Sequence, residues 1–254
     1  MRKAKRKLVK IGSQTAKRGF KNERDIVKKF NHWQTDEDAQ QWLQIMSYNL
    51  KEIERVKAII IPGSHKTDVQ VQITIYFKEA IATENLSVKL VNNPRGFNQI
   101  DKRWVDKYVE MWNIPKDIIK ALKLFTGETK PKVKNLRDPR RMFLNEMDNK
   151  TQKIIVDFFT KNKLLIVSDI LKGNDEFPAG WMMVVLKKKK KNPQWVLKHI
   201  NQVLNVFGGG DVRITDKGSL KIGKITMQRK GGDAGRETYK MLQFKINPVE
   251  LLNN

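Results

Sequence analysis

The stretch Val69–Val91 constrains the fold most, because it carries two successive runs in which apolar and polar residues alternate. Apolar side chains occupy every second position of Val69–Phe77, and later they occupy Leu86, Val88 and Leu90. A period of two residues is typical of a half-buried β-strand, whose successive side chains point to opposite faces. With the polar segment between them, the two runs predict a β-hairpin.

An acid and a lysine accompany this hairpin on its polar side. Asp68 precedes the first strand and shares its side with Gln70 and Gln72, whereas Lys89 shares a face of the second strand with Ser87. The hairpin would bring the acid beside the lysine, in a chain with a large excess of positive charge. That combination suggests metal-dependent chemistry on a phosphate backbone.

A second arrangement of an acid followed by a lysine competes with the first. Leu164–Val167 predicts a short strand that leads to Asp169, and Trp181–Leu186 predicts an apolar strand that leads to Lys187. Nothing polar stands two places before Lys187, so this pair ranks below the first. The five lysines at 187–191 fit a contact with phosphates and a solvated loop about equally well.

The charge balance points to a polyanionic partner. Lys and Arg number 51 against 27 Asp and Glu, a formal net charge of +24, which exceeds what solubility requires. No run approaches the roughly 18 to 20 apolar residues of a membrane span. The basic N-terminus lacks the apolar segment of a signal peptide. We therefore expect a cytoplasmic protein with no membrane partner.

The residue types available as ligands limit any metal to a hard cation. There is no cysteine, which excludes disulfides and thiolate sites, and His32, His65 and His199 are scattered singly. Zinc ligation therefore has no support. A cation bound by oxygen, such as Mg²⁺, fits what remains.

The rest of the chain predicts further helices and strands. Helices are expected from Ser13 onward and over Asp36–Tyr48, Trp104–Trp112, Ile118–Phe125 and Thr151–Asn162, with another opening at Asn192; strands are expected at Val56–Ile61, Val212–Thr215, Leu220–Gln228 and Tyr239–Ile246. The first helix carries Glu23, which faces either a site or water. A basic arm, Met1–Lys10, precedes it and either tracks phosphates or is a solvated tail.

Two loops carry residues suited to nucleic-acid contact. In Asn92–Lys102, the ring of Phe97 either wedges into a DNA step or anchors the loop on the core. In Gln228–Thr238, side chains that pair with base edges stand beside Gly231 and Gly232, which allow close backbone approach. A long hairpin also needs a glycine-rich loop, so this signal alone is weak.

These residues resemble the HinP-type type II restriction endonucleases, which recognise GCGC, and through them the PD-(D/E)XK nuclease superfamily. The similarity covers nearly the whole chain, and its most specific parts are Arg95–Lys102, Arg140–Phe143, Gln228–Asp233, Gly235–Thr238 and Met241–Lys245. The resemblance implies an α/β fold, a mixed β-sheet flanked by helices. It also implies hydrolysis of both strands of double-stranded DNA at a short palindrome with Mg²⁺, or Mn²⁺ in its place.

The expected organisation is one restriction-endonuclease-like domain over residues 13–254 behind a basic arm at 1–12. Its catalytic core would lie within about 13–110 and 150–190, and its β-rich recognition part within about 205–254. A cognate DNA methyltransferase would be a functional partner in a restriction-modification system. The enzyme would act as a monomer or a homodimer.

The resemblance assigns roles residue by residue. Asp68 matches the metal-binding aspartate and Lys89 the catalytic lysine. Ser87 departs from the pattern, because the family has glutamine there and the superfamily usually a carboxylate. A serine hydroxyl is a poorer metal ligand, so the site would depend on the Val88 backbone carbonyl, on waters and on Glu23.

Predicted DNA contacts fall in the two loops. They are Arg95, Phe97, Asn98, Gln99 and Lys102 in the first, and Gln228, Arg229, Lys230, Gly231, Gly232, Asp233, Arg236 and Thr238 in the second. One rival is a sequence-specific DNA-binding protein whose nuclease activity is weakened or lost through Ser87. Another is an RNA-binding protein, which explains the charge equally well.

Overall fold

The computed structural model describes residues 20–61, 70–174, 176–188, 192–232 and 236–253. The chain forms two compact units. Unit 1 comprises Met1–Asn98, Leu171–Val203 and Asn247–Asn254, and unit 2 comprises Gln99–Ile170 and Leu204–Ile246. None of the described helices is long and apolar enough to cross a membrane.

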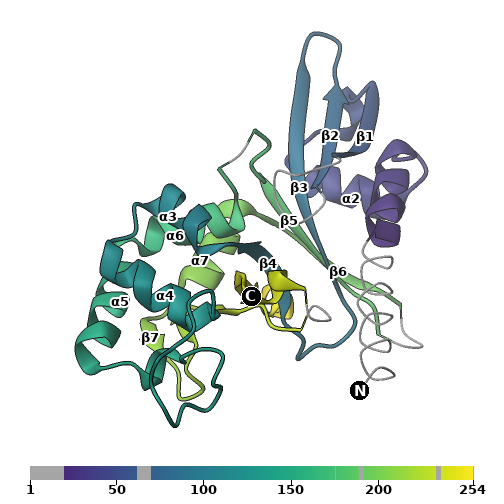
Figure 1. Cartoon of the computed structure of the whole chain (residues 1–254). Helices are drawn as coiled ribbons and strands as arrows, with labels where there is room; N and C mark the ends of the chain where they lie inside the picture. Colours follow the sequence, from purple (N-terminus) through teal and green to yellow (C-terminus); the bar gives the residue numbers. More distant parts are fainter. Residues whose placement is uncertain (1–19, 62–69, 175, 189–191, 233–235, 254) are drawn as a thin grey trace. The chain divides into compact units, whose positions relative to one another are not determined.

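Unit 1 is built on a five-stranded mixed sheet with the order β1-β2-β3-β5-β6 (Figure 1). The strands are β1 (Arg55–Ile61), β2 (Gln70–Tyr76), β3 (Ile81–Val91), β5 (Trp181–Leu186) and β6 (Gln194–His199). β3 and β5 run parallel, and the other neighbours are antiparallel. The expected mixed sheet flanked by helices is therefore confirmed.

The hairpin of β2 and β3 follows the alternation of the sequence. Val71, Ile73 and Ile75 are fully buried, because they point to the face covered by a helix over residues 20–31 and by α2 (Glu37–Ile45). β3 begins earlier than the apolar run suggests, at Ile81, because a tight turn from Phe77 to Ala80 lets polar residues pair with β2. Between α2 and β1 lies the short helix η1 (Leu50–Glu52).

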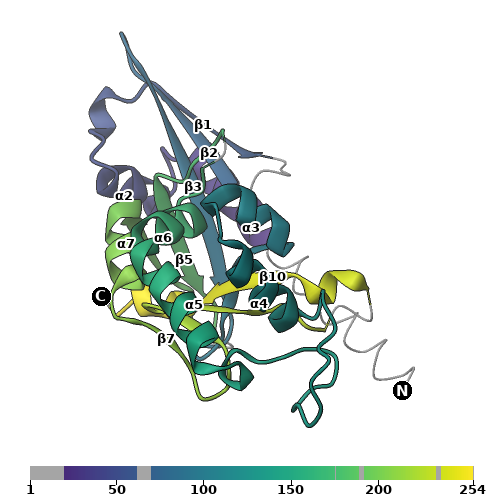
Figure 2. The same cartoon turned by 60° about the vertical axis from the view of Figure 1, so that its left-hand side comes forward.

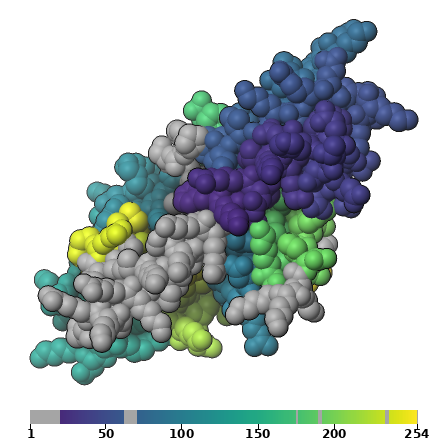
Figure 3. Space-filling model, turned by 90° about the vertical axis from the view of Figure 1, so that its right-hand side faces the viewer, coloured from purple at the N-terminus to yellow at the C-terminus, as the bar shows by residue number. Residues whose placement is uncertain are grey.

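Figure 3 shows the outer surface of this helical layer, in purple, beside the green segment around β5 and β6. The helix over residues 20–31 contributes Ile26 and Phe30 to the core, which the α2 residues Trp42 and Leu43 complete. Asp36 caps α2 by accepting a hydrogen bond from the N–H of Ala39, the arrangement that an acidic helix start predicts. These apolar stripes hold both helices on one face of the sheet.

Unit 2 contains a second five-stranded sheet, with the order β4-β10-β9-β8-β7; Figure 2 labels its strands β7 and β10. Its strands are β4 (Asn98–Arg103), β7 (Val212–Ile214), β8 (Leu220–Ile222), β9 (Ile225–Arg229) and β10 (Leu242–Ile246), and its helices are α3 (Val105–Trp112), α4 (Lys116–Thr126), α5 (Asn149–Lys161), α6 (Lys163–Leu171), η2 (Leu144–Glu146) and η4 (Glu237–Lys240). Phe244 on β10 packs against Tyr108 and Trp112 of α3. The chain also forms α7 (Ile200–Gly208) and η5 (Pro248–Leu251).

The strand expected at Leu164–Val167 is wrong, because this segment belongs to α6. Its apolar residues follow a helical burial pattern in which Ile166 and Ile170 are buried and Leu164 is exposed. Asp169 therefore lies on a helix, and its carboxylate accepts a hydrogen bond of 2.9 Å from the indole of Trp112. The competing acid-lysine pair does not form on one sheet.

Other expectations also differ from the structure. The strand expected at Leu220–Gln228 is divided into β8 and β9, and the strand expected from Tyr239 begins only at Leu242, after η4. The segment after Asn192 is the strand β6 rather than the start of a helix, and the helix α7 begins only at Ile200. β6 pairs antiparallel with β5 from Trp181 to Leu186, and these ladder hydrogen bonds outweigh a local helix start. The end of the polar loop, expected through Lys102, is the strand β4.

Gly127 ends α4 in a conformation that only glycine adopts without strain. Its φ is +79°, and a Cβ atom there would lie 2.7 Å from the carbonyl oxygen of Arg140. We expect Gly127→Ala to lower the free energy of unfolding by about 2 kcal/mol or more, since the left-handed backbone alone costs roughly 1 to 2 kcal/mol. Chemical denaturation measures the loss.

Gly231→Ala is the matched control for this substitution. Gly231 has a similar φ of +63°, but no heavy atom lies within 4 Å of the position of its Cβ. Gly231→Ala is expected to lower the free energy of unfolding only by the cost of the left-handed backbone, because its new Cβ atom meets no other atom. Equal losses in the two variants would contradict a close approach of the Arg140 carbonyl to α4.

Candidate functional site

A polar row lies on the face of the unit 1 sheet opposite to the helical layer. Gln72 pairs with Asn85 across β2 and β3, and their side chains are joined by a hydrogen bond of 3.3 Å. Ser87 and Lys89 continue this row along β3, because alternate residues of a strand share a face. Their neighbours Leu86 and Val88 belong to the core under the helices.

Ser87 and Lys89 are almost completely buried, with 1% and 3% of their surfaces exposed. Both stand on a strand at the centre of the sheet, where Ser87 is opposite Gln70 on β2 and Lys89 is beside Val184 on β5. A lysine is seldom buried so fully unless an anionic partner or a function requires it. The face of β3 that the alternation predicted to be polar therefore carries a buried ammonium group, that of Lys89.

Asp68 and Asp233 lie outside the described residues, as does the basic arm at 1–12. Along the polar row the described side chains offer neutral oxygen atoms, those of Ser87, Gln72 and Asn85. No group of three His, Cys, Asp or Glu that could hold a metal occurs among the described residues.

Glu23 lies on the buried stripe of the helix over residues 20–31, one turn before Ile26. Ile26 belongs to the same core as Leu86 and Val88, which is the other face of the sheet from Ser87 and Lys89. The role of Glu23 at a metal stays a prediction.

The loop after β3 presents Phe97 at the surface of unit 1. Asn93 shapes a turn, since its side chain accepts a hydrogen bond from the N–H of Arg95 and its carbonyl accepts one from Gly96. The side chain of Asn98 donates to the Leu90 carbonyl and closes the loop. Phe97 is 51% exposed, so it does not anchor this loop in the core.

The glycine-rich loop of unit 2 has a firmly held base. Arg229, whose side chain is 6% exposed, donates to the Tyr239 carbonyl and lies over the Tyr239 ring, 4.5 Å from its centroid. The buried amide of Gln243 donates to the carbonyls of Arg229 and Lys230. Beyond this base, Gly231 and Gly232 have positive φ and open space around them. Arg229 thus faces inward.

The other predicted residues of the two loops keep more solvent contact. Gln99, Lys102, Gln228, Lys230 and Thr238 are partly exposed, and Arg95 and Arg236 are exposed. Sequence analysis placed Gln72 on the polar side of the first run but missed its partner Asn85, because Asn85 was assigned to the polar segment between the two runs.

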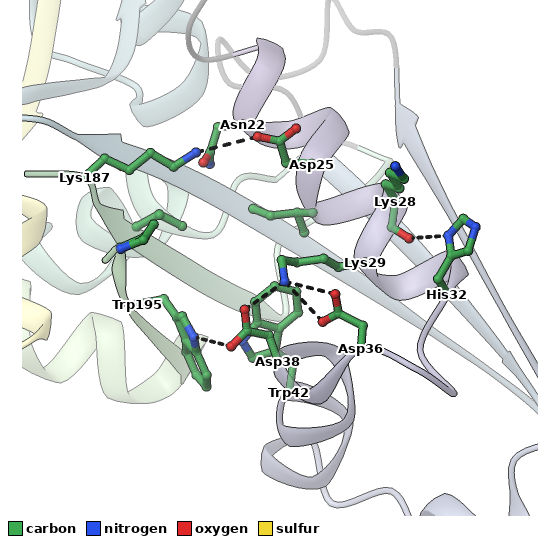
Figure 4. A pocket seen from close by; sticks show the side chains of 13 residues that line it. Asn22, Asp25, Lys28, Lys29, His32, Asp36, Asp38, Trp42, Lys187 and Trp195 are labelled. Carbon is green, nitrogen blue, oxygen red and sulfur yellow. Dashed lines mark hydrogen bonds and ion pairs between the residues drawn. The ribbon is translucent and has the colours of Figure 1, made fainter. Parts of the chain in front are cut away.

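A pocket of about 520 Å³ lies between the helix over residues 20–31, α2, β5 and β6 (Figure 4). Lys29 donates hydrogen bonds to Asp36 (3.0 Å) and Asp38 (2.9 Å), and Asp38 also accepts one from Trp195. Burial opposes the charge of Lys29, yet these carboxylates raise the pKa of its ammonium group. The pocket lies on the face of the sheet that the helices cover, and its charged side chains pair with one another. These pairs hold the helices against the sheet.

Residues 46–252 match the model of the family described as R.HinP1I restriction endonuclease. The chain belongs to the R.HinP1I restriction endonuclease family. It is thereby a type II restriction endonuclease, a sequence-specific deoxyribonuclease. The earlier resemblance is confirmed at the level of this family.

Among solved structures, the chain is similar to restriction endonuclease MspI in complex with its cognate DNA. The TM-score is 0.61 and the sequence identity is 12%, over 88% of this chain and 87% of that chain. At this identity the similarity shows the fold alone. No curated protein sequence matches the chain significantly.

Proposed function

We propose that this R.HinP1I family endonuclease cuts both strands of DNA at GCGC in a Mg²⁺-dependent reaction centred on Lys89. The buried lysine two residues after a buried serine, on the polar face of a central strand, carries the proposal. Electrostatic interactions are stronger where water is excluded. Buried charged groups are therefore frequent at reaction centres.

Asp68 and the Val88 carbonyl would hold the metal, since the described polar row supplies only neutral oxygen atoms and a hard cation needs an anionic ligand. Bound Mg²⁺ supplies polarisation of the scissile phosphate and lowers the pKa of a bound water. Lys89 donates hydrogen bonds to the attacking water and offsets negative charge on the phosphate. Gln70 and Ser87 orient these groups through hydrogen bonds.

DNA binding would combine the excess positive charge with the two loops. Phe97 is held at the surface by a hydrogen-bonded turn, which suits an aromatic wedge between base pairs. Gln228, Lys230 and Arg236 have the hydrogen-bonding groups for base edges. A cognate methyltransferase would protect the same sites in the cell.

Incubation with a sequenced plasmid over a Mg²⁺ titration tests this function. We expect discrete fragments whose mapped ends all lie at GCGC, and no cleavage when EDTA removes the metal. Replacement of Mg²⁺ by Mn²⁺ is expected to retain cleavage. Fragments that end at another sequence would contradict the GCGC assignment, and the absence of fragments at every metal concentration would contradict metal-dependent cleavage.

Ser87 favours one alternative, a sequence-specific DNA-binding protein with weakened cleavage. We expect Ser87→Gln to increase Mg²⁺ affinity and cleavage, because an amide carbonyl reaches further than a hydroxyl. The gain comes with a stability loss of roughly 1 to 3 kcal/mol, since Ser87 is 1% exposed and a larger side chain overpacks its site.

Calorimetric titration of the metal and cleavage rates measure this change. Ser87→Ala is the control, because it fits the same space without an oxygen. If Ser87→Gln folds and neither its metal affinity nor its cleavage rate changes, position 87 does not act at the metal.

A further inference from the structure

The segment Arg137–Phe143 of unit 2 gathers several arginines around a single carboxylate. Asp138 is 15% exposed on its side chain, and three guanidinium groups surround it. Arg140 is hydrogen-bonded to it, whereas Arg229 and Arg141 approach its Oδ2 to 3.5 and 3.6 Å. Three cations around one anion leave an excess of positive charge at this point.

Arg140 is the member of this cluster that faces solvent, with 70% of its side chain exposed. Its Nε donates to Oδ1 of Asp138 at 2.8 Å, and its Nη2 donates to Oδ2 at 3.0 Å. The two bonds fix the plane of the guanidinium group. They occupy two of its five N–H donors, so the end-on edge of Nη1 and Nη2 remains for another partner.

The carboxylate that holds Arg140 is itself held in place. Asp138 accepts the N–H of Arg140 at 3.1 Å, and the side-chain hydrogen bond from Arg140 lowers the pKa of Asp138, so the carboxylate stays ionised. Arg141 stacks 3.9 Å from the ring centroid of Phe143. Burial, together with the charge of Arg229, lowers the pKa of Arg141 to about 10, which still leaves it charged at neutral pH.

The backbone of this segment is braced as well. Glu146 accepts hydrogen bonds from the N–H groups of Arg137 and Phe143, at 3.0 and 2.7 Å. The N–H of Met142 donates to Leu124 at the end of α4. Figure 2 shows this connection as the long teal loop that follows α4. A loop so constrained presents Arg140 with little conformational entropy left to lose on binding.

The cluster is joined to the glycine-rich loop through Arg229. The same Asp138 oxygen that receives Nη2 of Arg140 lies 3.5 Å from Nη1 of Arg229. Arg229 is the residue that closes the base of that loop over Tyr239. One carboxylate therefore sets the position of an inward arginine and an outward arginine at once.

We infer that Arg140 is a specificity-determining residue that reads a guanine of the target through its end-on edge, and that Asp138 is its positioning residue. Two parallel N–H groups of arginine match O6 and N7 of guanine in the major groove. This inference rests on the proposed function, because it assumes a sequence-specific DNA target. An exposed ion pair serving stability alone would contribute little and would not need the braced loop.

The inference is tested by measuring the affinity of the protein for short duplexes. Fluorescence anisotropy reports the binding, at fixed salt and in EDTA. Each guanine of the preferred site is replaced in turn by 7-deazaguanine, which lacks the N7 acceptor. We expect wild type to lose about tenfold in affinity at one guanine, within the range of a good bidentate contact. Arg140→Ala is expected to bind the unmodified site about tenfold more weakly and to lose nothing further at that guanine.

Asp138→Asn tests positioning, because it keeps the shape and removes the charge that orients Arg140. It is expected to show a reduced response to 7-deazaguanine at that same guanine, and Asp138→Glu is expected to restore part of the response. Lys153→Ala is the matched control for the positive charge that Arg140→Ala removes, since Lys153 is an exposed lysine on α5 paired with Asp157. Its response to 7-deazaguanine should equal that of wild type.

Two other results would overturn the inference. If Arg140→Ala responds to 7-deazaguanine as wild type does, with a salt dependence lowered by one phosphate contact, Arg140 binds the backbone and reads no base. That result leaves the proposed function intact. If wild type itself prefers no duplex, both the proposed function and the inference fail.

Discussion

Asp68→Asn is expected to reduce DNA cleavage by about 10³-fold or more. The substitution keeps the shape of the side chain and removes the negative charge that a hard cation requires. A catalytic metal contributes several kcal/mol to the stabilisation of the transition state, and each 1.36 kcal/mol corresponds to a factor of ten in rate. Single-turnover cleavage of a plasmid at saturating enzyme measures the loss.

The same variant has a readout that does not depend on activity. Calorimetric titration of Mg²⁺ into the protein with bound DNA is expected to show a metal affinity at least about tenfold weaker, because an amide oxygen replaces a carboxylate. Glu79→Gln is the matched control, since Glu79 is an exposed acid in the turn of the same hairpin. If the metal affinity of Asp68→Asn is unchanged, Asp68 is not a metal ligand and another residue holds the metal.

Lys89→Ala is expected to lower the cleavage rate by roughly 10²- to 10³-fold, the usual effect of removing one preorganised electrostatic group from a reaction centre. Because Lys89 is buried on β3 and the proposed base-reading residues lie in loops, DNA affinity should stay within about twofold of wild type, well under the 1 kcal/mol or more of a lost base contact. Cleavage rates and anisotropy of the same duplex measure the two properties.

Two further lysine variants separate charge from packing. Lys89→Met fills the buried space without a charge, and it should lose as much activity as Lys89→Ala. Lys57→Ala removes an exposed lysine from β1 of the same sheet, and it should cleave at nearly the wild-type rate. If Lys89→Met retains cleavage, Lys89 has a packing role and another residue assists the attacking water.

The polar row on β3 was predictable because its information is local. Side chains of a strand alternate with a fixed period, so the positions of Ser87 and Lys89 on one face followed from the order of residues. The register with β2 did not follow, because the turn lies at Phe77–Ala80 and residues 81–85 pair with β2 instead of forming the connection. The R.HinP1I family resemblance then selected Lys89 over Lys187.

Whether Asp169 follows a strand or lies on a helix was not predictable in the same way. Residues 164–167 are apolar, and a short apolar run fits a buried strand and a buried helix equally well. Packing of Ile166 and Ile170 into the core of unit 2 selected the helix, and a hydrogen bond from Trp112 then engaged Asp169. Such a choice depends on partners that are distant in sequence.

The sequence by itself determined the alternating strands, the charge that implies a polyanion, and the pairing of a lysine with Ser87 on one face, because each is a property of neighbouring residues. Only the tertiary structure decided that Lys89 is buried, that Arg229 turns inward, and that Asp138 holds Arg140 toward solvent. Asp138 and Arg229 are about ninety residues apart. Their contact arises from packing between a loop and a strand, and no local pattern encodes it.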